Sequence, residues 1–192
     1  MPTIAKFEIC SKCSLHCKFC GISQEKCSKR DRLVTDDEFN RFLEFIGKIQ
    51  TIKEVALFYY GEAALHPHLS EFYKKLKLKN YYTFLTTNGT VKDNLMCSIP
   101  FIDSVKVSWN YIDFIDFHEK TGGSLNQYND IISNTLAFYD EVHRYGKKLT
   151  VSTIYDGDQK KYIPALSKLK YDEHYWLPLY SMNGVNKSGT HG

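Results

Sequence analysis

Three cysteines lie within eight residues near the start of the chain, at Cys13, Cys17 and Cys20. They follow a β-type run with the spacing Cys-x-x-x-Cys-x-x-Cys, which is typical of ligands of an iron–sulfur cluster. Three thiolates leave one iron of a four-iron cluster without a protein ligand, so that this iron is available to a small molecule. The spacing therefore predicts a cluster that acts on a bound molecule rather than one that only carries electrons.

Cys10 precedes this triplet by three residues and allows two other arrangements. Four thiolates would suit a structural zinc ion, but zinc ribbons and fingers separate their ligand pairs by about a dozen residues or more. Here only three residues separate the pairs. A cluster bound by all four cysteines would be a non-catalytic electron-transfer module, and this alternative stays open at the level of the cysteine spacing.

The composition favours a single enzyme-sized domain in a reducing compartment. The chain has 192 residues, 43% of them hydrophobic, and a formal charge of +3, which is too small to indicate a nucleic-acid partner. A basic run at residues 74–79 is explained by the end of a helix, whose dipole favours cations. No apolar segment approaches the roughly 20 residues that cross a bilayer. With six cysteines and no secretory leader, we expect reduced thiols and a cytoplasmic location, with Cys27 and Cys97 as structural or incidental thiols.

Short β-type runs alternate with helical stretches along the chain. The pattern predicts strands at residues 5–10, 55–60, 82–85, 104–108, 149–154 and 174–177. It predicts helices at about residues 35–49, 69–78, 92–97, 126–145 and 163–169. The first helix has the clearest signal, because Thr35 begins a capping box with Glu38.

Six strands interleaved with five helices predict an α/β fold. Right-handed crossovers would curl the parallel strands toward a partial (β/α)6 barrel with outer helices, although an open doubly wound sheet is the alternative. The chain is too short for eight units, which take about 250 residues. We expect residues 1–178 to form this core domain and residues 179–192 to form a polar, flexible tail.

Polar residues follow the predicted strands at the edge where ligands of parallel α/β folds bind. Gly61 and Glu62 follow the second strand, where glycine permits a close approach and a carboxylate suits an ammonium group. Asn88 follows the third strand, and Ser108 and Asn110, at the end of the fourth, suit sugar hydroxyls. Each of these residues alone is also an ordinary turn or capping residue. Their placement on successive strand ends predicts one common site.

These motifs together resemble the radical S-adenosylmethionine (radical SAM) enzymes. Residues 7–20 look like the cluster loop of that family, and the resemblance extends over roughly residues 6–155. The downstream motifs that match in order lie at residues 61–62, 65–67, 87–90, 107–108 and 118–124. The chain departs from the family pattern at Tyr60 and Ala63, where relatives often have glycine and proline, and at Cys10, where they usually have threonine or serine.

The resemblance implies that Cys13, Cys17 and Cys20 hold a [4Fe–4S] cluster whose fourth iron binds the methionyl amine and carboxylate of S-adenosylmethionine. The other cofactor contacts that we expect are Phe19 and Trp176 beside the adenine, Glu62 at the methionyl amine, Ser108 and Asn110 at the ribose, and Gly61 and Asn88 in the same site.

The implied activity is reductive cleavage of S-adenosylmethionine to a 5′-deoxyadenosyl radical that takes a hydrogen atom from a substrate. The electron would come from an external reductant of the flavodoxin or ferredoxin type. The chain is similar to enzymes that modify peptides or mature cofactors, but it has no cysteine after Cys97 for an auxiliary cluster. We expect a peptide or other large substrate, because so short a barrel leaves its lateral opening uncovered. Activation of a glycyl-radical partner is the alternative within this family.

Overall fold

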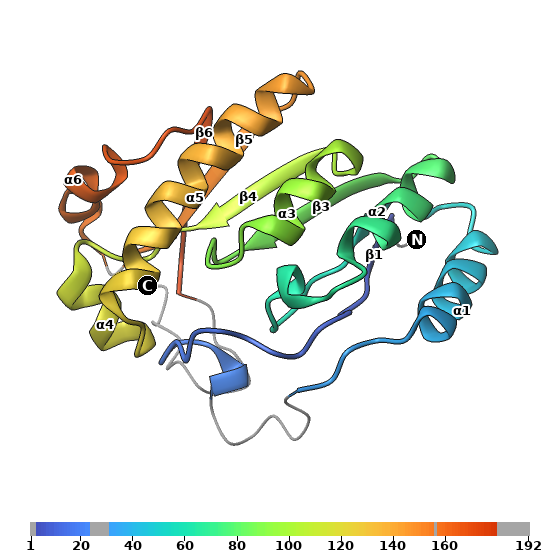
Figure 1. Ribbon diagram of the computed structural model, residues 1–192, viewed down its shortest axis with the longest axis horizontal. Coiled ribbons are helices and arrows are strands. Elements are labelled where there is room, and N and C mark those ends of the chain that lie inside the picture. The colour runs from blue at the N-terminus through green and yellow to red at the C-terminus, as the bar shows by residue number, and fades with distance from the viewer. Residues whose placement is uncertain (1–2, 24–30, 156, 180–192) are drawn as a thin grey trace, which may run out of the picture.

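The computed structural model describes residues 3–23, 31–155 and 157–179 (Figure 1). In these residues six parallel strands form one sheet in the order β1-β2-β3-β4-β5-β6. The strands are β1 Ile4–Lys6, β2 Glu54–Ala56, β3 Tyr82–Thr87, β4 Ser104–Ser108, β5 Leu149–Ile154 and β6 Glu173–Leu177. Because the order never reverses, the sheet is not doubly wound. The predicted α/β fold with a partial barrel of parallel strands is confirmed.

Helices connect the strands. They are α1 Asp36–Gly47, α2 Leu69–Leu78, α3 Asp93–Ser98, α4 Phe114–Thr121, α5 Leu125–Arg144 and α6 Ile163–Leu166. The α4 helix was not predicted, because its eight residues are too few for a clear periodic signal. It begins where the Asp113 side chain accepts a hydrogen bond from the Asp116 backbone N–H, and it ends at Gly122, whose φ is 69°.

The helices lie along one face of the sheet, as Figure 1 shows for α2, α3 and α5. Right-handed crossovers between neighbouring strands place every connection on the same side. On β4 the buried Val105 and Val107 point to this side, whereas Ser104, Lys106 and Ser108 are half-buried and point to the opposite side. We call that opposite side the inner face of the sheet.

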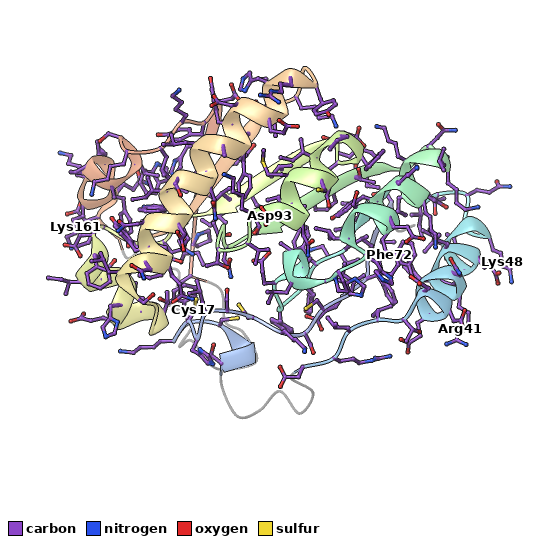
Figure 2. The ribbon with its side chains drawn as sticks, viewed as in Figure 1. Cys17, Arg41, Lys48, Phe72, Asp93 and Lys161 are labelled. Atoms are coloured by element: carbon purple, nitrogen blue, oxygen red, sulfur yellow. The ribbon has the colours of Figure 1, made fainter. Side chains whose placement is uncertain are left out.

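Aromatic side chains dominate the packing between the helices and the sheet. The Phe72 ring of α2 stacks on the Phe39 ring of α1 with 3.9 Å between centroids (Figure 2). Phe42 of α1 stacks in the same way on Phe7, just after β1, at 4.2 Å. These stacks fix α1 against both α2 and the first strand, and so define the path of the chain into the cysteine loop.

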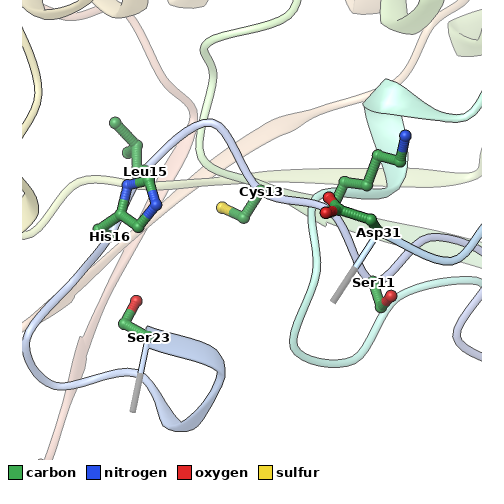
Figure 3. Close-up of a pocket in the computed structure, with 7 residues that line it drawn as sticks. Ser11, Cys13, Leu15, His16, Ser23 and Asp31 are labelled. Carbon is green, nitrogen blue, oxygen red and sulfur yellow. The ribbon is translucent and has the colours of Figure 1, made fainter. Parts of the chain in front are cut away.

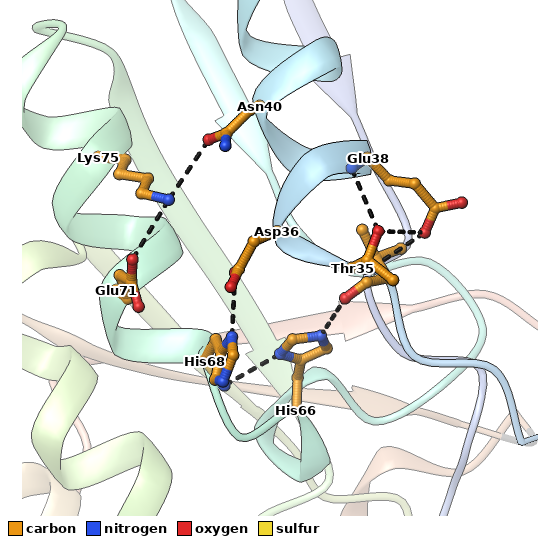
Figure 4. A network of polar contacts seen from close by, with 9 residues as sticks. Thr35, Asp36, Glu38, Asn40, His66, His68, Glu71 and Lys75 are labelled. Atoms are coloured by element: carbon orange, nitrogen blue, oxygen red, sulfur yellow. Dashed lines mark hydrogen bonds and ion pairs between the residues drawn. The ribbon is translucent and has the colours of Figure 1, made fainter.

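A polar network joins the start of α1 to the loop after β2 (Figure 4). The predicted capping box of Thr35 and Glu38 is present. The His66 Nε2 lies 2.9 Å from the Val34 carbonyl oxygen, and the His66 Nδ1 accepts a hydrogen bond from the His68 backbone N–H. Burial lowers the pKa of His66, which favours the neutral ring that these two contacts require. The loop that carries Glu62 is thereby tied to α1.

Two strands end earlier than predicted. β1 ends at Lys6 rather than at Cys10, because Ile9 and Cys10 pair with the returning segment at Leu33 and Val34. β2 ends at Ala56 rather than at residue 60. The last predicted helix is also shorter, because α6 stops at Leu166.

Two sequence-based predictions concern residues outside the described part of the chain, namely most of the polar tail at residues 179–192 and the thiol of Cys27. Among the helices of the described residues, none combines the length and the apolar character that a membrane span requires.

Candidate functional site

The loop that carries the three cysteines is fastened to the end of α4. The His16 backbone N–H donates to the Thr121 carbonyl at 2.9 Å, and the Lys18 N–H donates to the Lys120 carbonyl at 2.8 Å. These carbonyls belong to the last turn of the helix, where backbone acceptors lack helical partners. The unpredicted helix α4 therefore holds the cysteine loop in place.

Ser14 connects the same loop to two further elements. Its hydroxyl lies 2.6 Å from the Thr90 hydroxyl, in the turn after β3, and its carbonyl accepts a hydrogen bond from the Gln127 side chain of α5 at 3.2 Å. Ser14 thus anchors the loop to residues 76 and 113 positions away in the sequence.

The thiols of Cys13, Cys17 and Cys20 lie close enough to influence one another's protonation. Burial, followed by the nearby Glu62 and Cys20, raises the pKa of the Cys13 thiol to about 11. Burial together with Cys13 and Cys20 raises the pKa of Cys17 well above the usual thiol range. Such thiols are protonated at neutral pH unless a metal stabilises the thiolates. Three mutually close, half-buried thiols are a donor set that fits an iron–sulfur cluster.

Cys13 also lines a cavity of about 260 Å³ (Figure 3). Ser11, His16, Ser23 and Asp31 contribute polar groups to its wall. The cavity lies directly beside the cysteine loop, so a molecule bound to a cluster there would find polar partners.

Cys10 is set apart from the triplet. Its side chain is buried, and its thiol lies 3.8 Å from the Lys12 carbonyl oxygen. Burial raises the pKa of Cys10, with smaller contributions from Glu62 and Glu8, and no cysteine among the described residues contributes to it. In the structure Cys10 behaves as a small buried side chain rather than as a member of the thiol group.

The structural role of glycine at position 61 differs from the one expected from the sequence. A Cβ atom at this position would lie 2.0 Å from the Cys10 carbonyl oxygen and 2.8 Å from the Ser11 Cα. The protein backbone, and not a ligand, occupies the space that the missing side chain leaves. The Glu8 carboxylate holds this contact in place, because it accepts hydrogen bonds from the backbone N–H groups of Tyr60 and Gly61 at 2.8 and 3.0 Å.

Glu62 and Asn88 form the centre of the site. Glu62 is buried, and its carboxylate accepts hydrogen bonds from the Thr87 hydroxyl at 2.8 Å and from the backbone N–H groups of Asn88 and Ala64 at 2.7 and 3.2 Å. The Asn88 side chain donates in turn to the Cys13 sulfur at 3.5 Å. Burial raises the pKa of Glu62 despite these three donors. A carboxylate and an amide thus stand beside the thiols at the ends of β2 and β3.

A second cavity, of about 170 Å³, lies on the other side of the cysteine loop. Phe19 and Asn110 line it, together with Lys120, Tyr155 and Tyr162. The wall is mostly apolar and aromatic, which suits a flat heteroaromatic group.

The remaining predicted residues have separate positions. The Asn110 side-chain oxygen accepts a hydrogen bond from the Ile154 N–H at 2.7 Å, so that Asn110 joins the ends of β4 and β5. Ser108 is half-buried on the inner face at the end of β4. Trp176 does not line the aromatic cavity, but its ring contacts Tyr155 and Tyr162, each at 5.9 Å between centroids. It therefore supports the wall from behind.

Sequence reasoning missed several residues that shape the site. Tyr155 follows β5 directly, so the strand-end rule that located Asn88 would have found it. Glu8, Lys120 and Tyr162 give no such signal, because their roles depend on contacts with residues far along the chain. The Lys120 ammonium donates to the Asn110 carbonyl at 3.2 Å and forms an ion pair with Asp116 at 2.9 Å.

Comparison with known proteins adds three findings. The family model described as the radical SAM superfamily matches residues 7–169. SuiB of Streptococcus suis, solved with the precursor peptide SuiA, superposes with a TM-score of 0.73 at 17% identity, covering 96% of this chain and 41% of SuiB. No curated protein matches the chain significantly.

Two further solved structures are similar. TYW1 with a bound lysine–pyruvate adduct has a TM-score of 0.63 at 18% identity and covers 86% of this chain and 61% of its own. The protein anSMEcpe, solved with bound AdoMet, has a TM-score of 0.63 at 14% identity and covers 92% and 51% respectively. At these identities the likeness shows a shared fold. The chain spans about two fifths to three fifths of the length of these relatives.

Proposed function

Because the chain belongs to the radical SAM superfamily, whose members use a [4Fe–4S] cluster and S-adenosylmethionine, we propose that Cys13, Cys17 and Cys20 bind the cluster here. The observation that carries this proposal is that three half-buried thiols lie close together beside Asn88 and Glu62, with the pKa values of Cys13 and Cys17 raised by burial. Cys10 is excluded from the ligand set in this proposal, since it is buried beside the Lys12 carbonyl and none of the three thiols contributes to its pKa.

The residues around the thiols have separate roles in binding S-adenosylmethionine in this proposal. Glu62 accepts a hydrogen bond from the methionyl ammonium, because a buried carboxylate with three neutral donors is best balanced by a cation. Asn88 orients both Glu62 and the Cys13 sulfur. Phe19 and Tyr155 enclose the adenine in the aromatic cavity, with Trp176 as support. Ser108 and the amide nitrogen of Asn110 face the ribose, and Gly61 keeps the loop close to Cys10.

When bound, the cluster and S-adenosylmethionine would supply methionine and a 5′-deoxyadenosyl radical, with one electron from an external flavodoxin- or ferredoxin-type donor, and the radical would take a hydrogen atom from the substrate. The contribution of the chain is to hold the reacting groups at the strand ends and to exclude water from them. The buried positions of Glu62 and Asn110 support the second role.

The proposed substrate is a peptide. The inner face of the sheet carries no covering helix among the described residues, which leaves room for a large molecule beside the strand ends. SuiB, which has the same fold, is described with a precursor peptide bound, and this supports the same substrate class for the present chain.

The test is anaerobic reconstitution of the cluster, followed by incubation with dithionite and S-adenosylmethionine and measurement of 5′-deoxyadenosine. We expect the wild-type protein to bind about four irons per chain and to form 5′-deoxyadenosine. The Cys13→Ala variant should lose both properties, whereas Cys10→Ala should retain both. Cys97→Ala, at an exposed position away from the loop, is the matched control.

Three results would overturn the proposal. A protein with a full cluster that forms no 5′-deoxyadenosine would not be an enzyme of this kind. Loss of the cluster in Cys10→Ala would favour the four-cysteine electron carrier instead. Zinc without iron in the reconstituted protein would point to a structural metal site.

A further inference from the structure

A third cavity, of about 370 Å³, lies on the inner face of the sheet, away from the cysteine loop. Strand residues line it, among them Glu54, Thr86, Ser104, Lys106, Thr150 and Glu173. Neither the sequence motifs nor the cofactor site described above involves this cavity. Its lining mixes these polar groups with the apolar and aromatic side chains of Tyr82, Phe84, Leu85 and Tyr175.

Lys106 is central to this lining. It lies in the middle of β4, in register with Thr86 of β3 and Thr150 of β5. Its neighbours Val105 and Val107 are buried against the helices, so the Lys106 side chain extends from the inner face. The site therefore offers one ammonium group flanked by two hydroxyl-bearing residues, all from rigid strands.

The charge of Lys106 is not balanced by a carboxylate. Burial lowers the pKa of Lys106, and Lys6 on β1 lowers it further. In the residues that the structure describes, no carboxylate lies within 4.0 Å of either lysine. Lys6 does not line the cavity, but its charge repels that of Lys106, and an anion bound at Lys106 would relieve that repulsion.

The acidic groups of the cavity do not neutralise the charge of Lys106. Glu173 is engaged by the Lys148 ammonium and by the Tyr175 hydroxyl, both at 2.8 Å. Glu54 is the first residue of β2 and forms no ion pair with Lys6 or Lys106. Neither carboxylate contributes to the pKa of Lys106. The Lys106 ammonium group is therefore available to an anion that comes from outside the protein.

We propose that Lys106, assisted by Lys6, binds a carboxylate of the peptide substrate on the inner face of the sheet. This inference rests on the proposed function and names the substrate chemistry, an acidic side chain or a C-terminal carboxylate. Lys106 precedes Ser108 by two residues, which is about 6.6 Å along a strand. A peptide anchored at Lys106 therefore extends from the inner face toward the strand ends, where hydrogen abstraction is proposed to take place.

The experiment uses the reconstituted protein with its lysines reductively methylated with ¹³C, which preserves their positive charge. The probe is N-acetyl-glutamic acid α-amide, which carries one carboxylate, and its neutral counterpart is N-acetyl-glutamine amide. Both are titrated while the ¹³C signals of the lysines are recorded. Comparison with Lys106→Met and Lys6→Met assigns the two signals, and Lys74→Met, on the exposed side of α2, is the control.

We expect the carboxylate probe to shift the Lys106 signal saturably and to raise the pKa of Lys106, while the amide does neither. Binding should weaken about tenfold or more in Lys106→Met, less in Lys6→Met, and not at all in Lys74→Met. Equal responses to the acid and the amide, or no response at Lys106, would overturn the inference. The wild-type titration decides this even if Lys106→Met fails to fold.

Different results would refute the proposed enzyme activity and the proposed anion site. If the protein binds the carboxylate but forms no 5′-deoxyadenosine, the anion site is supported and the proposed enzyme activity is refuted. If the protein forms 5′-deoxyadenosine but does not bind the carboxylate, the enzyme activity is supported and the anion site is refuted.

Discussion

The Glu62 carboxylate and the Asn88 backbone N–H lie 2.7 Å apart, although 26 residues separate them in the sequence. This hydrogen bond joins the ends of β2 and β3, and the Asn88 side chain extends the connection to the Cys13 sulfur at 3.5 Å. Three segments that are distant in the sequence therefore depend on one buried carboxylate. Disturbing Glu62 should affect both the stability of the protein and the thiol group.

The Glu62→Gln variant tests this relationship. A glutamine presents an NH₂ group to a site in which the Thr87 hydroxyl and the backbone N–H groups of Ala64 and Asn88 are all donors. We therefore expect the free energy of unfolding of the cluster-free protein to fall by about 1–3 kcal/mol at pH 5. Because burial raises the pKa of Glu62, its stabilising contribution is complete below the unfolded pKa of about 4.3 and decreases as the pH rises through the folded pKa. The difference from wild type should therefore shrink at higher pH, as measured by urea unfolding.

The control for this variant is Glu71→Gln on α2, whose side chain is 54% exposed and pairs with Lys75. It should change the stability by no more than about 0.5 kcal/mol. A deficit for Glu62→Gln that grows with pH would contradict the argument that burial dominates at Glu62.

The Gly61→Ala variant tests the backbone contact beneath the site. A Cβ atom 2.0 Å from the Cys10 carbonyl oxygen forces the backbone apart, so we expect a loss of about 1–3 kcal/mol in the free energy of unfolding and a smaller yield of reconstituted cluster. Gly47→Ala at the end of α1 is the matched control, because nothing lies within 4 Å of its added methyl group. That control should be neutral or up to about 1 kcal/mol more stable. Equal effects of the two substitutions would refute the steric explanation.

The fold was predictable from local patterns. The strands at residues 104–108 and 149–154, the helix Leu69–Leu78 and the capping box at Thr35 are as predicted, because hydrophobic period and capping chemistry are encoded within a few neighbouring residues. The ends of β1 and β2 were not predictable from local patterns. Their boundaries depend on contacts between distant segments, such as Glu8 with the backbone of Tyr60, 52 residues later.

Part of the arrangement of the candidate site was predictable. The strand-end rule pointed to Glu62 and Asn88, which the structure places beside Cys13, and to Asn110, which it places in the cavity that Phe19 lines. It did not reveal that Gly61 makes room for the Cys10 carbonyl, or that Trp176 stands behind Tyr155. A close backbone approach and a supporting ring follow from three-dimensional packing, which leaves no mark in the spacing of one sequence.

The raised thiol pKa values predict how the cluster-free protein reacts with iodoacetamide. With a pKa of about 11, roughly one Cys13 thiol in a thousand is ionised at pH 8, so its alkylation should be slow and should rise about tenfold per pH unit toward pH 11. Cys17 should be slower still, whereas the exposed Cys97 should be alkylated first. Mass spectrometry of the digested protein separates the sites. Rapid alkylation of Cys13 at pH 8 would show that the thiols are already ionised without metal.

The aromatic cavity leads to a prediction for cofactor affinity. If Tyr155 and Phe19 enclose the adenine, removal of the tyrosine ring in Tyr155→Ala should raise the dissociation constant for S-adenosylmethionine about tenfold, because stacking of a base on an aromatic ring contributes roughly 1–3 kcal/mol. The change is measured by equilibrium dialysis against the reconstituted protein, with iron content determined in parallel. Tyr145→Ala, at the exposed end of α5, should leave both values unchanged. Retention of full affinity by Tyr155→Ala with a complete cluster would place the adenine outside this cavity.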